Sequence, residues 1–388
     1  MLLLIRNAEV YAPESLGRRD VLVGAGRIVR VAPGLHVDDS WCEVVDAAGR
    51  VLVPGFVDSH VHMSGGGGEG GFATRTPELP LSDAITGGIT TVIGCLGTDG
   101  VGRSLAVLLA KARAFDEEGI TAFMLTGSYA VPVQTLTASI ERDLLFIDKI
   151  VGVGEIALSD HRSTQPAFDE FLRLSSESRR GGILSGKAGV VNVHMGDGRR
   201  GLEYLRRAVA ETEIPAGQFV PTHVNRNPTL FEESIAYARG GGLVDFTTST
   251  VPAFIEEGEV KCSQGLRRML ESGVPATQIT FTSDGQGSLP HFDAHGRTIG
   301  LGIGRVTSLF PEVRDAVLVE KIPLETALAV ITSNPARIYK LRGKGAIAPG
   351  ADADLVMLEG DELAIRSVMA KGRWLMKDGE MLAKGTFE

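Results

Sequence analysis

The sequence is poor in cysteine and lacks long apolar runs. Cys42, Cys95 and Cys262 are its three cysteines, and they lie far apart along the 388 residues. An odd, sparse count argues against a disulfide framework and favours a reducing compartment. No apolar run reaches the roughly 20 residues that a membrane span needs. Residues 1–7 contain a short apolar run, but they lack the preceding positive charges and the cleavage site of a signal peptide. We therefore expect a cytoplasmic protein that does not insert into a membrane.

Positive charge is also scarce and is nowhere clustered. The chain carries 39 basic and 48 acidic residues, which gives a net charge of −9. Nucleic acid is therefore an unexpected partner, although a few local arginines can still bind a small anionic ligand. The 43% hydrophobic and 22% charged residues fit a globular protein with a sizeable core.

The two ends of the chain share one pattern, and the middle has another. Residues 1–52 and 345–388 contain short alternating strands separated by Gly and Asp turns. Neither end has enough strands for a core of its own. We expect the two ends to form one small β-sandwich domain, with a separate domain over residues 53–344.

The middle alternates short apolar strands with helical patterns, which indicates an α/β fold with a parallel sheet. Leu105, Leu108, Leu109, Ala112 and Phe115, for example, recur at helical spacing. Eight strand candidates in about 290 residues match the size of a (β/α)8 TIM-like barrel. They cover residues 51–57, 90–96, 121–125, 151–158, 189–194, 219–223, 243–247 and 278–283.

Ionisable side chains stand at the ends of five of these strands, where barrels of this kind carry their chemistry. His60 and His62 close the first strand and project to the same side, because side chains alternate along a strand. A lone histidine would most often be a satisfied core residue. Several ionisable groups at matching ends of apolar strands instead indicate a metal site. The candidate ligands are His60, His62, Glu155, His194, His223 and Asp284.

This ligand pattern resembles the amidohydrolase superfamily, and the split terminal domain resembles it too. The closer resemblance is to isoaspartyl (β-aspartyl) dipeptidases, and it covers nearly the whole chain. Seven runs carry it: residues 62–69, 74–78, 96–99, 125–129, 159–163, 222–227 and 283–288. The resemblance implies metal-dependent hydrolysis of β-aspartyl dipeptides and a homo-oligomer, since relatives form octamers.

The resemblance also implies a site of two Zn²⁺ ions and a metal-activated hydroxide. His60, His62, Glu155 and Asp284 would hold one ion, and Glu155, His194 and His223 the other. Asp284 would act as general base and then as general acid. One departure is that Glu155 stands where these dipeptidases have a carboxylated lysine. Lys149 cannot take that place, because it lies before the strand, at the wrong end of the barrel. Since the bridging ligand differs from that of the dipeptidases, a site with a single ion remains an alternative.

Substrate contacts follow from the same resemblance. Tyr129 would stabilise the oxyanion, and Glu69 would pair with the free ammonium. Arg162 and Arg226 would hold carboxylates in a forked geometry. Thr98, Ser288 and the Gly67 backbone would add hydrogen bonds.

Other interpretations stay open. The enzyme could act on a different amide, such as a cyclic amide or an N-acyl amino acid, or the barrel could be an inactive binding protein. Cys95 could be a thiolate ligand, although a small core residue is the favoured interpretation. The glycine run 65–70 satisfies a dinucleotide-binding pattern, but no helix is expected after it because Pro77 and Pro80 interrupt the segment. The sequence leaves open which residue follows the isoaspartyl group.

Overall fold

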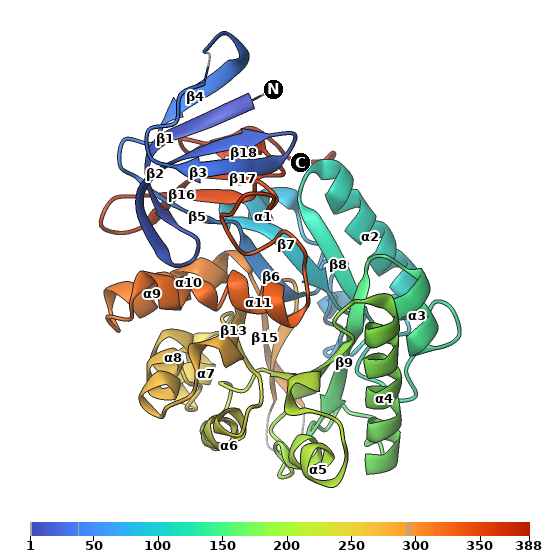
Figure 1. Cartoon of the computed structure of the whole chain (residues 1–388). Helices are drawn as coiled ribbons and strands as arrows, with labels where there is room; N and C mark the ends of the chain where they lie inside the picture. The colour runs from blue at the N-terminus through green and yellow to red at the C-terminus, as the bar shows by residue number, and fades with distance from the viewer. Residues whose placement is uncertain (1, 38, 293–294, 296) are drawn as a thin grey trace.

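Both ends of the chain contribute to one nine-stranded sheet in the computed structural model, which describes residues 2–37, 39–292, 295 and 297–388 (Figure 1). The hydrogen-bonded order is β19-β18-β17-β16-β5-β1-β2-β3, and β4 pairs with β1. The C-terminal strands therefore extend the N-terminal sheet through the β5–β16 pair. The strands are β1 (Leu2–Tyr11), β2 (Ser15–Gly24), β3 (Arg27–Ala32), β4 (Cys42–Asp46), β5 (Val51–Pro54), β16 (Leu355–Glu359), β17 (Ala364–Ala370), β18 (Arg373–Lys377) and β19 (Glu380–Met381).

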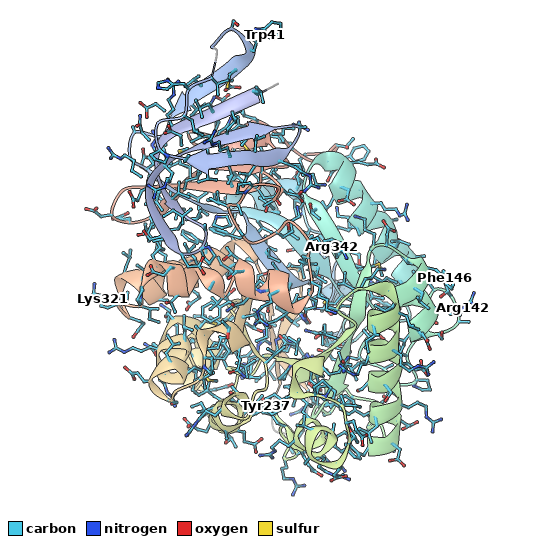
Figure 2. All side chains as sticks on the ribbon, viewed as in Figure 1. Trp41, Arg142, Phe146, Tyr237, Lys321 and Arg342 are labelled. Carbon is cyan, nitrogen blue, oxygen red and sulfur yellow. The ribbon has the colours of Figure 1, made fainter. Side chains whose placement is uncertain are left out.

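This terminal sheet has a hydrophobic cluster built from both chain ends. Val21 and Val23 of β2 are buried, whereas Leu22 between them is only half-buried, as the alternating pattern predicts. Leu355 and Met369 from the C-terminal strands belong to the same cluster. Trp41 lies at the outer tip of this sheet and is 77% exposed (Figure 2). Side chains from the two ends of the chain thus share one hydrophobic cluster.

The middle of the chain contains eight parallel strands in two sheets. Six pair in the order β11-β10-β9-β8-β7-β6, and β12 pairs with β13. Backbone hydrogen bonds link the two sheets at both edges, from Val224 N to Asp245 O (3.3 Å) and from His62 N to Gly285 O (2.8 Å). The result is a TIM-barrel-like arrangement. Its strands are β6 (Phe56–Val61), β7 (Ile89–Gly94), β8 (Thr121–Thr126), β9 (Ile150–Leu158), β10 (Val190–Met195), β11 (Phe219–Thr222), β12 (Val244–Thr247) and β13 (Ile279–Thr282).

The first predicted strand, residues 51–57, is in fact two strands that belong to different sheets. Strand β5 pairs with β1 and β16, and strand β6 pairs with β7. The chain changes sheets at Gly55, whose N–H donates to Asp354 O (2.8 Å). Every residue of the segment is apolar except for the glycine, so the hydrophobic pattern could not reveal the break.

Helices follow most of the parallel strands and cover them from outside (Figure 1). Helix α2 buries Leu105, Leu108, Ala112 and Phe115, as its spacing predicts, and Ser104 caps it by accepting from Val107 N (3.3 Å). The helices are α1 (Leu81–Thr86), α2 (Leu105–Glu118), α3 (Ile140–Phe146), α4 (Phe168–Ser185), α5 (Glu203–Glu211), α6 (Pro228–Arg239), α7 (Pro252–Glu256), α8 (Cys262–Glu271), α9 (Leu309–Leu318), α10 (Leu324–Ala329) and α11 (Ser333–Ile338).

An antiparallel hairpin of β14 (Ser288–Phe292) and β15 (Thr298–Ile303) follows the last parallel strand and was not predicted. It brings Ser288 and Pro290 to the mouth of the barrel, where both line a cavity. Within the described part of the chain, none of the helices has the length and apolar character required to cross a bilayer.

Candidate active site

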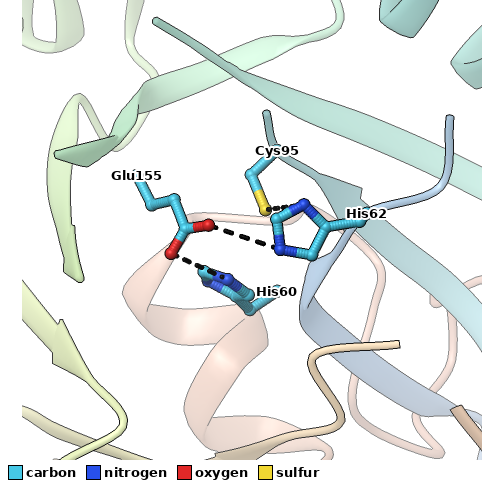
Figure 3. A group of neighbouring side chains, drawn as sticks. All are labelled: His60, His62, Cys95 and Glu155. Carbon is cyan, nitrogen blue, oxygen red and sulfur yellow. Dashed lines mark hydrogen bonds and ion pairs between the residues drawn. The ribbon is translucent and has the colours of Figure 1, made fainter. Parts of the chain in front are cut away.

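Two histidines and a glutamate meet at the carboxyl ends of the parallel strands (Figure 3). His60 lies near the end of β6, and His62 follows that strand. Each Glu155 oxygen faces one ring: Oε2 is 3.3 Å from His60 Nε2, and Oε1 is 3.3 Å from His62 Nε2. All three side chains are buried. Alternation along β6 has therefore turned both imidazoles inward, as the sequence predicts.

A bulge in β9 directs Glu155 toward these histidines. Val191 of β10 pairs with Val153, but Val193 pairs with Ile156, so β9 has one extra residue at this point. Gly154 has φ 145°, and a Cβ on it would lie 2.6 Å from Asn192 O. Only glycine fits there, and the bulge it permits places the next side chain, Glu155, inside the barrel.

Glu155 also faces the histidines that follow from β10 and β11. Its Oε2 is 3.1 Å from His194 Nδ1 and 3.6 Å from His223 Nε2. The potential ligand atoms of Glu155, His194 and His223 all lie within 4.8 Å of one another, and so do those of His60, His62, Cys95 and Glu155. Glu155 thus belongs to two neighbouring groups that could each hold a metal ion.

Asp284 reaches the same point from the end of β13. Its Oδ1 is 3.1 Å from His62 Nε2 and 3.8 Å from His60 Nε2, and its Oδ2 accepts from an Arg226 guanidinium nitrogen at 3.0 Å. The carboxylate therefore stands between the histidines and an arginine. The structure has brought all six predicted ligands together.

The donor set fits a divalent cation. Within the described residues, neither ring nitrogen of the fully buried His60 has an aligned hydrogen-bond partner. Leaving such groups unsatisfied away from water is costly. Imidazole and carboxylate ligands together suit zinc and similar first-row metals, so a bound cation would satisfy these atoms.

Electrostatics favour the protonation states that ligands need at His223, Glu155 and Asp284. At His60 and His62 the effect of burial is outweighed by Cys95 and the neighbouring carboxylates, which hold the pKa of both rings well above its usual value. Burial lowers the pKa of His223 to about 3, aided by the charges of His194 and Arg226, so this imidazole is neutral at neutral pH. Burial alone would raise the pKa of Glu155, but His60 and hydrogen bonds from His194 and His223 hold it well below its usual range. The same balance of burial against His62, His223 and Arg226 lowers the pKa of Asp284. Both carboxylates are therefore ionised.

Three side chains that the sequence reasoning did not assign to this role contact the ligand histidines. Thr247 Oγ1 is 2.5 Å from His223 Nδ1, Asp160 Oδ2 is 3.1 Å from His194 Nε2, and Cys95 Sγ is 4.0 Å from His62 Nδ1. Each contacts the ring nitrogen that faces away from Glu155. Partners of this kind fix the tautomer and orientation of a ligand histidine. Cys95 was expected to be a core residue. It is buried, and it also touches the first ligand group.

The predicted substrate-binding residues surround the ligand groups and pair with one another. Glu69 accepts hydrogen bonds from Thr98 Oγ1 (2.9 Å) and Ser288 Oγ (2.7 Å). Arg162 lies 3.5 Å from Glu69 and donates to Asp160 through two nitrogens (3.0 and 2.7 Å). Tyr129 Oη is 2.8 Å from His194 Nδ1. Every predicted site residue except His60 lines one cavity, Gly67 included, and His60 is fully buried.

Buried imidazoles and carboxylates at the carboxyl ends of a TIM-barrel-like sheet define a metal-dependent hydrolase. Residues 51–375 match the amidohydrolase family, and the chain belongs to that family.

Comparison with known proteins shows which members of the amidohydrolase family this chain is similar to. A β-aspartyl dipeptidase from Fervidobacterium islandicum AW-1, solved in complex with the dipeptide β-Asp-Leu, is 46% identical. The match covers 98% of each chain with a TM-score of 0.92. A second structure of β-aspartyl dipeptidase from that organism is 44% identical, with a TM-score of 0.89 and 98% of each chain covered. A dihydroorotase from Elusimicrobium minutum is 26% identical over 92% of this chain and 88% of its own. The predicted resemblance to β-aspartyl dipeptidases is confirmed.

Proposed function

We propose that this protein hydrolyses β-aspartyl (isoaspartyl) dipeptides. Such a substrate has one free ammonium and at least two carboxylates. The observation that carries the proposal is that the ligand groups are flanked by one carboxylate, Glu69, and two arginines, Arg162 and Arg226, in a single cavity. The similarity to a β-aspartyl dipeptidase with β-Asp-Leu bound supports the same assignment.

The hydrogen bonds around Glu69 suit an ammonium. Thr98 and Ser288 each donate to one of its oxygens, which keeps the carboxylate in place while each oxygen can accept further hydrogen bonds. Arg162 is the nearest cation, at 3.5 Å. The substrate ammonium would complete the environment of Glu69, and Arg162 would remain available for a carboxylate.

Arg226 connects substrate binding to proton transfer. It now donates to Asp284 at 3.0 Å. A substrate carboxylate that took over this guanidinium would release Asp284 to accept a proton from water and to deliver it to the leaving amine. Tyr129 would donate to the developing oxyanion. The bound metal would supply an acidic water and would polarise the scissile carbonyl.

For the metal we propose two Zn²⁺ ions, with Glu155 in place of a carboxylated lysine. His60, His62, Glu155 and Asp284 would hold one, and Glu155, His194 and His223 the other. The two groups that share Glu155 support this count. Metal analysis of purified protein should give two zinc ions per chain. One ion per chain would favour the mononuclear alternative.

We further propose that the eight parallel strands form a closed (β/α)8 barrel over residues 53–344. The terminal sheet would fold into a β-sandwich from residues 1–52 and 345–388. The edge hydrogen bonds of the barrel and the shared terminal cluster support this division.

We also propose that the protein is cytoplasmic, because its cysteines are few and far apart in the sequence. We propose further that it forms a homo-oligomer, for which exposed aromatic residues such as Trp41 offer apolar surface. Light scattering of the purified protein tests the assembly.

A substrate panel tests the activity. The zinc-loaded protein should hydrolyse β-Asp-Leu and should leave α-Asp-Leu, dihydroorotate and N-acetyl amino acids intact. Dihydroorotate matters because of the similarity to a dihydroorotase, but this ring offers no ammonium to Glu69. Activity confined to dihydroorotate or to the acylated compounds would overturn the dipeptidase proposal. A metal-loaded protein without any turnover would indicate a binding protein.

A further inference from the structure

A second cavity opens beside the catalytic cavity, on the far side of its two arginines. Arg162, His194, Arg226 and Pro290 line both cavities. The proposed function gives these arginines the substrate carboxylates. The residue that follows the isoaspartyl group carries its own carboxylate next to its side chain. A dipeptide held by this shared wall therefore places that side chain at the entrance of the second cavity.

The second cavity combines apolar and acidic side chains with the two arginines that it shares with the catalytic cavity. Met195, Phe254 and Pro290 line it, together with Asp197, Glu257 and Glu259. Two of these acids already have partners: Glu257 Oε1 is 2.7 Å from His291 Nε2, and Asp197 Oδ1 accepts from Asn227 Nδ2 at 3.2 Å. Glu259 differs from both.

Glu259 is a buried carboxylate with an unused oxygen. Its exposed fraction is 7%, and its Oε2 has no hydrogen-bond partner in the described part of the chain. Its backbone N–H donates to Phe254 O at 2.9 Å, which fixes the residue at the cavity wall. Burial raises the pKa of Glu259, and the charge of Arg226 and a hydrogen bond from Thr250 only partly oppose this. Arg226 itself is engaged by Asp284. The free Oε2 can accept a hydrogen bond from a cationic group, which would offset the cost of burying this carboxylate.

We propose that this cavity binds the side chain of the residue after the isoaspartyl group, and that Glu259 selects dipeptides in which that residue is lysine or arginine. The inference rests on the proposed function and adds the preferred substrate class. The aliphatic stem of such a side chain would lie along Met195, Phe254 and Pro290, and its cationic head would reach Glu259.

The test compares β-Asp-Lys with β-Asp-norleucine, because norleucine has the same aliphatic stem and lacks the ammonium. Wild-type protein should give a kcat/KM about tenfold higher for β-Asp-Lys, the size expected of a hydrogen bond to a charged group. In Glu259→Gln this ratio should fall to about one. A ratio measured in one preparation does not depend on the fraction of active enzyme, so partial misfolding of the variant leaves it valid.

Glu256→Gln is the matched control. Glu256 is the last residue of α7, three positions before Glu259, and it is exposed and does not line the cavity, so its substitution removes the same charge nearby without touching the site. The control should keep the wild-type ratio. Equal kcat/KM values for both dipeptides in the wild type, or an unchanged ratio in Glu259→Gln, would overturn the inference while leaving the dipeptidase function intact. Failure of the wild type to hydrolyse any β-aspartyl dipeptide would overturn the proposed function itself.

Discussion

Two clusters of buried charge lie in different parts of the molecule, one at the barrel mouth and one between the barrel and the terminal sheet. In the second, the Lys344 side chain is 3% exposed. It donates to Thr121 Oγ1 of β8 (2.7 Å) and to Asp354 Oδ2 (2.6 Å), and it lies 2.9 Å from Asp352. Asp354 also accepts from Lys371 N at 2.7 Å. Arg27 pairs with Asp352 at 3.0 Å, so two positive and two negative side chains are matched here without any ligand.

The mouth is equally buried but is incompletely paired. Glu155 faces four histidines, and neither nitrogen of His60 has an aligned hydrogen bond among the described residues. A buried polar cluster that is complete stabilises the fold, whereas one with unused donor atoms needs a ligand. The difference separates a structural charge cluster from a functional one, although both lie at strand ends and both contain acidic residues.

Removing the charge at the centre of the mouth should have the largest effect. We expect Glu155→Gln to lose bound metal and to lower kcat/KM for β-Asp-Leu by about a thousandfold or more, since it removes the carboxylate that both ligand groups share. Metal content by mass spectrometry and steady-state kinetics measure this.

The contrast between the clusters supplies the control for this variant. Lys344→Met changes the other buried cluster and should keep its metal. If Glu155→Gln retained full metal and full turnover, the mouth would not be a metal site built on Glu155.

The second prediction concerns the Lys344 cluster between the barrel and the terminal sheet. Lys344→Met leaves the buried Asp354 without its cation, while Asp352 keeps Arg27 at 3.0 Å, and breaking a buried pair in this way costs about 3–5 kcal/mol of unfolding free energy. Urea denaturation measures the loss, and kcat per folded molecule should stay near the wild-type value.

Lys340→Met is the matched substitution four residues earlier. Lys340 is exposed and donates to Lys187 O at 3.1 Å, so its loss should change stability by less than about 0.5 kcal/mol. Equal stability of the two variants would show that the Lys344 cluster does not hold the terminal sheet to the barrel.

The sequence was sufficient to predict the location of residues that stand at the ends of parallel strands. His60, His62, His194, His223 and Asp284 all follow from the alternation of side chains and the common edge of parallel strands. The sequence was insufficient where a contact depends on local irregularities of the backbone or on residues that meet only in the folded chain. The bulge that turns Glu155 inward, the change of sheet at Gly55 and the hairpin β14–β15 have no periodic signal. The partners of the histidines were also missed, although Asp160 stands in the polar run directly after β9.

One such missed partner should have an intermediate effect. Asp160 contacts His194 and holds Arg162 through two hydrogen bonds, so Asp160→Asn should disturb both a ligand and a substrate contact. We expect kcat/KM to fall about 10–100-fold, the usual cost of losing such a supporting group. The loss should include a higher KM, because Arg162 is released.

Asp143→Asn controls for the removal of a buried carboxylate. Asp143 accepts from Thr126 Oγ1 (2.5 Å) and from the backbone and hydroxyl of Thr137 (2.8 and 2.6 Å), away from the site. It should lower the melting temperature without the rise in KM. An equal rise in KM in both variants would contradict the role given to Asp160.

The smallest expected effect comes from a single hydroxyl at the mouth. Thr247→Val removes the partner of His223 Nδ1 and leaves the rest of the ligand set in place. A neutral hydrogen bond contributes about 1 kcal/mol, so we expect about a fivefold weaker hold on the metal, measured by competition with a chelator. Thr248→Val is the control, because Thr248 is buried beside it and its hydroxyl contacts Ser308 Oγ at 2.7 Å. Equal metal affinity in the two variants would mean that the orientation of His223 is set by packing alone.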